Sequence, residues 1–233
     1  MLTAARLALS DVFSPPLRSV MLKSLGLTLL LLLALWLAVT ALLAWAIDIE
    51  SYPWLDTAIG ILTGLGLLIG LGFLVAPVAS LFAGLFTDQI AGAMEALHYS
   101  FDPPGRELPV SQAVRDAIVF TGSVIVVNLI ALAFLVVGVG AIAFLIGNGY
   151  LLGREFFEAI ARRYLSREGA RAARRANRVK LFVAGLLIAG IAAVPVVNLM
   201  TPLFATAFML HLYKRTIRPV PAEWLDFDPR QAG

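Results

Sequence analysis

The sequence contains no cysteine and only two histidines. Without cysteine there are no disulfide bonds, thiolate nucleophiles or cysteine-ligated metal sites. His98 and His211 stand far apart, and neither has a histidine or cysteine one helical turn away, so we predict no histidine–carboxylate metal centre. The motifs of serine hydrolases, zinc proteases, P-loop enzymes and dinucleotide-binding folds are also missing. We therefore expect a protein that is not an enzyme and has no cofactor.

Charged residues are scarce as well. They form 14% of the 233 residues, and hydrophobic residues form 60%. Soluble domains average about 25% charged and about 45–50% apolar residues. A bilayer accepts this much apolar surface directly, so the composition predicts one integral membrane domain over residues 1–233. The first long apolar run far exceeds the roughly 7–15 residues of a signal-peptide core, and we expect it to stay in the membrane.

Four long apolar regions organise the chain. The first contains no charge and no proline, and it is long enough for a transmembrane helix. The second carries Gly60 and Gly64, and then Gly66 and Gly70, a spacing that lets another helix pack closely in lipid. The predicted segments are a first span at about 25–47, a second span at about 57–98, a hairpin at about 117–146, a basic amphipathic helix at about 153–178 and a second hairpin at about 181–213.

The third and fourth apolar regions each carry helix breakers near the middle. The fourth has Pro195, Asn198 and Pro202. Each region is therefore either one long tilted span or two short helices that dip into the bilayer and return. Basic residues favour the cytoplasmic side, and a crossing third region would place the basic segment after it outside. We therefore predict an all-helical protein with two transmembrane helices and two re-entrant, half-penetrating hairpins, its N-terminus cytoplasmic.

The hairpin tips have two interpretations. Backbone that is not helical is tolerated at membrane depth only where protein or water satisfies its polar groups. The breaks therefore either line a water-filled cavity, as in transporters, or shape a packed bundle. The sequence alone does not decide between them.

Four short stretches, in order and over most of the chain, resemble CysZ-type sulfate permeases. They are Ser14–Arg18 before the first span, Ala76-Pro77 in the second, Gly149–Phe157 after the first hairpin, and Val194–Leu199 with Pro202 in the second hairpin. The resemblance implies two transmembrane helices with two half-penetrating hairpins. It also implies sulfate uptake across the bacterial inner membrane for cysteine biosynthesis, without ATP hydrolysis.

In that family the anion site lies at the loop before the first long helix. The resemblance therefore implies a sulfate site at Leu17, Arg18, Ser19 and Lys23. Ser19 stands where the family has a second arginine, and Pro16 stands where it has glycine. From the residues alone, a helix N-terminus with a basic side chain suits an oxyanion, but Arg18 and Lys23 equally suit anchoring at lipid headgroups.

Other polar residues near the membrane are pore or gate candidates with structural alternatives. Arg154 and Glu155 suit either a pore mouth or an ion pair. Asn128 and Asn198 suit either a pore lining or a bridge between helices. The basic segment between the third and fourth regions favours contact with anionic lipid, and no nucleic-acid-binding module accompanies it.

These observations predict a sulfate permease or channel that also accepts sulfite or related oxyanions. A subunit with two full spans has little material for a private pore, so we expect a homo-oligomer, with the glycine stripe as one contact. The alternative is a membrane scaffold or assembly protein that transports nothing.

Overall fold

The computed structural model describes residues 1–46, 86–107 and 140–217, with isolated residues within 60–65, 109–134 and 220–225. In this part of the chain every regular element is a helix, and one isolated bridge pairs Leu165 with Leu225. The predicted all-helical class is thus confirmed for these residues. The predicted second span and first hairpin lie largely outside them.

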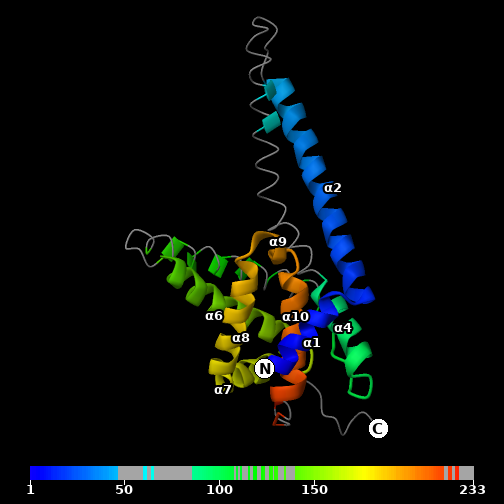
Figure 1. Cartoon of the computed structure of the whole chain (residues 1–233), viewed down its shortest axis with the longest axis vertical. Helices are drawn as coiled ribbons and strands as arrows, with labels where there is room; N and C mark the ends of the chain where they lie inside the picture. Colours follow the sequence, from blue (N-terminus) through cyan, green and yellow to red (C-terminus); the bar gives the residue numbers. More distant parts are fainter. Residues whose placement is uncertain are drawn as a thin grey trace, which may run out of the picture.

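The longest helix, α2, covers Pro15–Ala46. Its 32 residues make a rod of about 48 Å, longer than the roughly 30 Å hydrocarbon core of a bilayer. Among the described residues it is the one helix long and apolar enough to cross a membrane. The most apolar stretch within Pro15–Leu42 has a mean hydropathy of 2.5, and 11% of that stretch is buried. Figure 1 shows α2 rising well above the other labelled helices. An apolar helix so exposed is suited to lipid, because the core helix of a soluble protein would be covered.

A short helix, α1 (Leu2–Val12), precedes α2 and has no counterpart among the predicted segments. Its small residues Ala4 and Ala8 are buried where it packs on α10 (Thr201–Leu212). The apolar pattern does not reveal α1, because its buried stripe is narrow and consists mainly of alanine. The helix leads directly into the turn before α2.

Helix α6 (Gly140–Ala161) crosses α8 (Arg178–Ala192) at a contact made of glycines. A Cβ atom on Gly185 would overlap the backbone oxygen of Gly149, and one on Gly153 would overlap the backbone oxygen of Leu181. The two backbones therefore approach more closely than any side chain at these positions allows.

The predicted breakers of the fourth apolar region divide it into α8, α9 (Pro195–Asn198) and α10. Pro195 and Pro202 each lie in the first turn of a helix, where their missing N–H costs no hydrogen bond. Figure 1 shows α8 and α10 side by side, joined at the top through α9. With 15 and 12 residues, the limbs extend about 22 and about 18 Å, too short to cross a bilayer.

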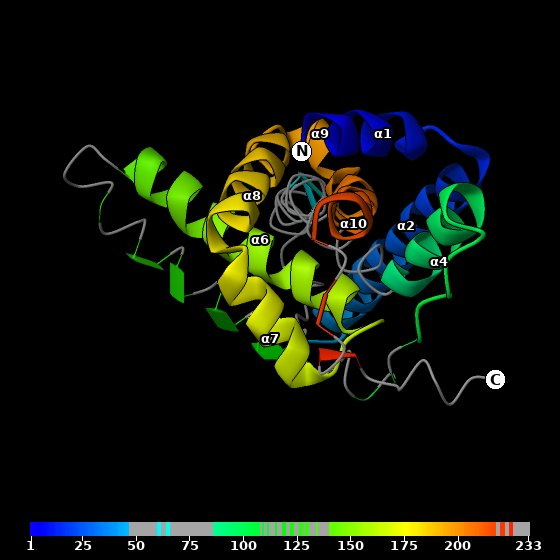
Figure 2. The ribbon, with the colours of Figure 1, turned by 90° about the horizontal axis from the view of Figure 1, so that it is seen from below.

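Helix α10 forms the centre of the molecule, and all of its residues are buried. Seen from below in Figure 2, it is surrounded by α1, α8, α6 and the pair formed by α2 and α4 (Thr87–His98). It continues into a π-helix at Tyr213–Ile217. The core therefore packs the N-terminal helix α1 against α10, about 200 positions later in the sequence.

The prediction of one continuous basic helix at 153–178 is wrong. Helix α6 ends at Ala161, and a new helix, α7, covers Arg167–Ala176. The hydroxyl of Ser166 accepts a hydrogen bond from the Gly169 N–H at 3.0 Å and caps α7. The intervening Tyr164 and Leu165 turn into the core, where both are buried. The helical spacing of the apolar residues did not reveal this turn.

Candidate functional site

The predicted sulfate-binding residues lie in the first turns of α2. The side chains of Arg18, Ser19 and Lys23 are exposed. Leu17 differs from them, because its side chain is fully buried in the core. Leu17 can therefore offer an anion only its backbone N–H.

The backbone at this helix end has few donors left. Pro15 and Pro16 carry no N–H, and the Arg18 N–H donates to the Ser14 carbonyl oxygen at 2.9 Å. Leu17 therefore carries the first backbone N–H of α2. The Ser14 hydroxyl, at the same end, is buried with no hydrogen-bond partner among the described residues. An anion here would be held mainly by side chains rather than by the free N–H groups that the sequence suggested.

Arg154 and Glu155, predicted as pore-mouth or ion-pair residues, line a shallow surface depression with Ser123. Arg154 makes an ion pair, with its Nε 3.6 Å from a carboxylate oxygen of Glu158, and Arg174 contacts the same oxygen at 2.7 Å. The structure therefore supplies the ion pair for Arg154. It places no ring of charge around a channel within the described residues.

Of the two asparagines, Asn128 lies outside the described residues. Asn198 is half-buried at the hairpin tip, and its N–H donates to the Val194 carbonyl oxygen at 2.8 Å. Deeper in the hairpin, Thr201 and Thr206 are buried, and their hydroxyls have no hydrogen-bond partner among the described residues. Helix α10 thus adds two buried hydroxyl groups to the hairpin, in which Asn198 was the polar residue expected from the sequence.

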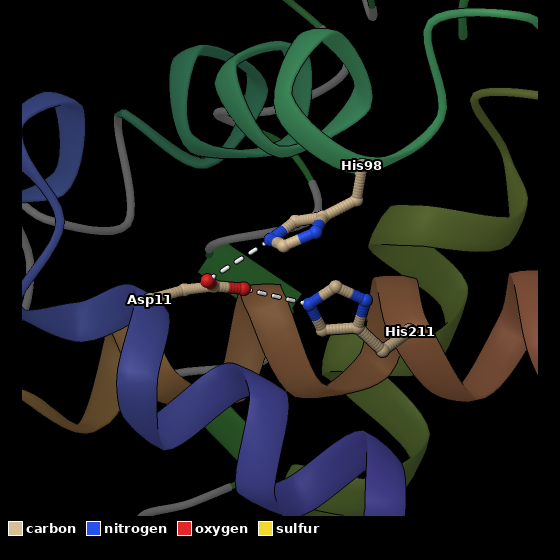
Figure 3. Close-up of side chains that lie close together, drawn as sticks. All are labelled: Asp11, His98 and His211. Atoms are coloured by element: carbon tan, nitrogen blue, oxygen red, sulfur yellow. Dashed lines mark hydrogen bonds and ion pairs between the residues drawn. The ribbon is translucent and has the colours of Figure 1, made fainter.

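Three residues that the sequence kept apart meet below the hairpin. One carboxylate oxygen of Asp11 lies 3.0 Å from Nε2 of His98, and the other lies 2.8 Å from Nε2 of His211. Figure 3 shows both imidazole rings pointing at this carboxylate, from α4 above and α10 at the side. The separation of the two histidines in sequence, used above to exclude a histidine–carboxylate centre, is therefore misleading. Folding brings both of the chain's histidines to one acid.

A second polar cluster lies nearby, around Arg163. Its guanidinium pairs with Asp88 and donates from Nε to Glu95 at 3.2 Å, and Glu95 also accepts from the Tyr164 hydroxyl. Burial opposes the charged guanidinium, but the neighbouring carboxylates raise the pKa of Arg163 above its ordinary value. Burial and the bond to Glu95 raise the pKa of Tyr164 far above the usual range. With both pKa values raised, Arg163 stays charged and Tyr164 stays neutral at neutral pH.

Lys214, at the end of the central helix, connects the two clusters. Its Nζ lies 3.0 Å from Asp102 and over the rings of Tyr164 and Tyr99, at 4.5 and 5.5 Å from their centroids. The Tyr99 hydroxyl in turn lies 2.8 Å from His211 Nδ1, and burial raises the pKa of Tyr99 to about 12. The two clusters and Lys214 therefore form one continuous set of polar contacts near the C-terminal end of α10. We call this set the polar floor; it consists of Asp11, Asp88, Glu95, His98, Tyr99, Asp102, Arg163, Tyr164, His211 and Lys214.

Sequence reasoning missed both clusters. In the sequence, Asp11 is 87 residues from His98 and 200 residues from His211. Glu95 is 68 residues from Arg163. No local motif marks such pairs. The one available signal is the presence of acidic residues and histidines inside helices that are otherwise apolar on one side.

Among the described residues every regular element is a helix, and α2 is exposed, apolar and long enough to cross a membrane, as in a helical membrane protein. A family model described as "Sulfate transporter CysZ/Etoposide-induced protein 2.4" matches residues 4–202, and the chain belongs to this family. The predicted family membership is thus confirmed. No significant match to a curated protein or to a solved structure was found.

Proposed function

We propose that this protein is a sulfate permease or channel that brings sulfate across the bacterial inner membrane for cysteine biosynthesis. The observation that carries the proposal is the family match, which extends over residues 4–202 and so includes the predicted anion site. The family is one of transporters, which supports transport over catalysis.

The proposed anion site is the N-terminal end of α2, at Arg18, Ser19 and Lys23. Ser19 and Lys23 are one helical turn apart and share a face, while Arg18 is the next residue around the helix. All three are exposed, and Arg18 lies in the first turn of α2, beside the positive end of the helix dipole. The buried Ser14 hydroxyl adds a donor at the same end. With the prolines removing backbone donors, one arginine and one lysine carry most of the charge recognition, a pattern that also admits sulfite.

The proposed topology keeps every basic segment on the cytoplasmic side. The first apolar stretch of α2 crosses the bilayer, while the α8–α9–α10 hairpin enters it and returns. The ion then passes beside the hairpins, where Asn198, Thr201 and Thr206 supply polar groups. A homo-oligomer completes the route, and Gly60 and Gly64 are candidate contacts, since a Cβ on either meets no described residue within 4 Å.

A growth experiment tests this function. Bacteria lacking their own sulfate uptake systems are given sulfate as the sole sulfur source, with or without this gene. We expect growth only with the gene, and equal growth of both strains on cysteine. Failure to grow on sulfate, with the protein present in the membrane, would favour a scaffold role.

Binding of labelled sulfate to the purified protein tests the site separately. Arg18→Ala should weaken binding about tenfold or more, because a hydrogen bond to a charged group contributes about 1.5–3 kcal/mol. Ser19→Arg should tighten it by supplying the second arginine of the family loop. Arg6→Ala is the matched control, since Arg6 is an exposed arginine in α1. Equal affinity in all four proteins would place the site elsewhere.

A further inference from the structure

The cluster of Asp11, His98 and His211 has the donor set of a transition-metal site. One ligand atom from each residue lies within 4.8 Å of the others. Two imidazole nitrogens and one carboxylate oxygen are ligands that suit zinc and leave a fourth position open. We propose that this cluster binds one divalent transition-metal ion of the zinc class per chain.

The geometry requires only a small adjustment. A tetrahedral zinc with bonds of about 2.0–2.2 Å holds its ligand atoms about 3.4 Å apart. The ring nitrogens already face the carboxylate, at 3.0 and 2.8 Å. The side chain of His98, at the end of α4, is 27% exposed, whereas that of His211 is fully covered. Rotation of His98 therefore brings the ligands together without moving a helix, and its exposed side gives the ion a way in.

Tyr99 supports the metal-bound arrangement. Its hydroxyl lies 2.8 Å from Nδ1 of His211, the nitrogen that does not face Asp11. A ligating histidine usually donates its other N–H to an oxygen, which fixes the ring and its tautomer. When Nε2 holds the metal, Nδ1–H donates to the Tyr99 oxygen. When the metal is absent, the same hydroxyl donates to Nδ1 and Nε2–H donates to Asp11.

The three ligands come from three separate parts of the fold. Asp11 ends α1, His98 ends α4, and His211 lies near the end of the central helix α10. A bound ion therefore ties the N-terminal helix to the core directly ahead of α2. This role does not depend on which ion the protein transports.

Cobalt(II) substitution tests the site. The probe is Co²⁺ added to metal-free, tag-free protein in detergent, because tetrahedral Co²⁺ absorbs far more strongly in the visible than octahedral Co²⁺. The chain has two histidines, and both lie in the cluster, so no other histidine competes. We expect one Co²⁺ per chain with a tetrahedral spectrum, displaced by Zn²⁺, and a higher melting temperature with Zn²⁺.

Variants separate metal binding from folding. His98→Gln, at an exposed side chain, should abolish the tetrahedral spectrum and the Zn²⁺-dependent rise in melting temperature. Tyr99→Phe should keep the spectrum and weaken affinity about 10–100-fold. Glu168→Gln, an exposed acid on α7, is the control and should bind as the wild type does. A wild type without a tetrahedral spectrum, or a spectrum unchanged in His98→Gln, would overturn the proposal. The cluster would then only join α1, α4 and α10 through hydrogen bonds.

Discussion

At the scale of single residues, the buried polar side chains set this fold apart from a simple apolar bundle. The side chain of Arg163 is 2% exposed and pairs with Glu95 and Asp88. Such a group is costly to bury unless every partner is present. The cluster therefore fixes one arrangement of α4 against the turn between α6 and α7.

Loss of Arg163 should destabilise the protein strongly. Arg163→Met leaves two carboxylates without their cation, which we expect to lower the free energy of unfolding by about 3–5 kcal/mol. Thermal unfolding in detergent measures this. Adding Glu95→Gln should recover part of the loss, because it removes one of the uncompensated charges. Arg167→Met, at an exposed position of α7, is the control, and equal stability of the two single variants would contradict the account.

From the sequence, positions within one helix could be predicted better than contacts between polar residues of different helices. The position of Arg18 at the start of the long helix follows from local pattern and resemblance. The meeting of Asp11 with His98 and His211 does not, because it depends on how three helices pack. Leu17 shows the same limit, since nothing local reveals that its side chain points into the core.

At the scale of helices, the places where proline interrupts a helix could be predicted from the sequence, whereas the capped start of α7 could not. Pro195 and Pro202 predicted the division of the fourth region, because proline cannot continue a helix. Ser166 caps α7 and ends the predicted basic helix early, but a serine among arginines carries no distinct signal. Helix α1 is short and its buried stripe is alanine, so its apolar periodicity is weak.

The glycine crossing of α6 and α8 leads to a sharp test on a single helix. Gly185→Ala places a methyl group against the backbone of Gly149 and should cost about 1–3 kcal/mol of stability through overpacking. Gly190→Ala is a matched control on the same helix, because a Cβ there meets nothing within 4 Å. Melting temperatures in detergent compare the two. A Gly185→Ala protein as stable as Gly190→Ala would show that the helices do not pack this closely.

The proposed re-entrant topology of the α8–α9–α10 hairpin gives a second prediction at this scale. Cysteines are introduced singly at Val197, exposed in α9, and at Arg175, exposed in α7, in a chain that has no native cysteine. In cells, an impermeant thiol reagent should leave Val197→Cys unlabelled from either face, because the proposed topology places the tip within the bilayer. Arg175→Cys should be labelled only when the cytoplasmic face is opened. Labelling of Val197→Cys from outside would mean that the region crosses the membrane.

At the scale of the whole molecule, most of the described helices gather around α10, and α2 extends beyond them with most of its apolar surface exposed. This division fits a protein whose long span meets lipid while its short hairpin is supported by the bundle. The polar floor joins α1, α4 and the end of α10, and its Asp11 lies shortly before the start of α2. In the proposed function, the anion site at Arg18 lies at the start of α2, seven residues after Asp11 of the polar floor.

Sulfate uptake into vesicles tests whether this protein transports sulfate by itself. Labelled sulfate uptake is measured in proteoliposomes holding wild type, Arg18→Ala or the control Arg6→Ala, against empty vesicles. We predict saturable uptake by the wild type and Arg6→Ala, and at least a tenfold loss in Arg18→Ala, in line with about 1.5–3 kcal/mol for its bond to a charged ligand. If folded wild-type protein moves no more sulfate than empty vesicles do, the protein is not a sulfate permease.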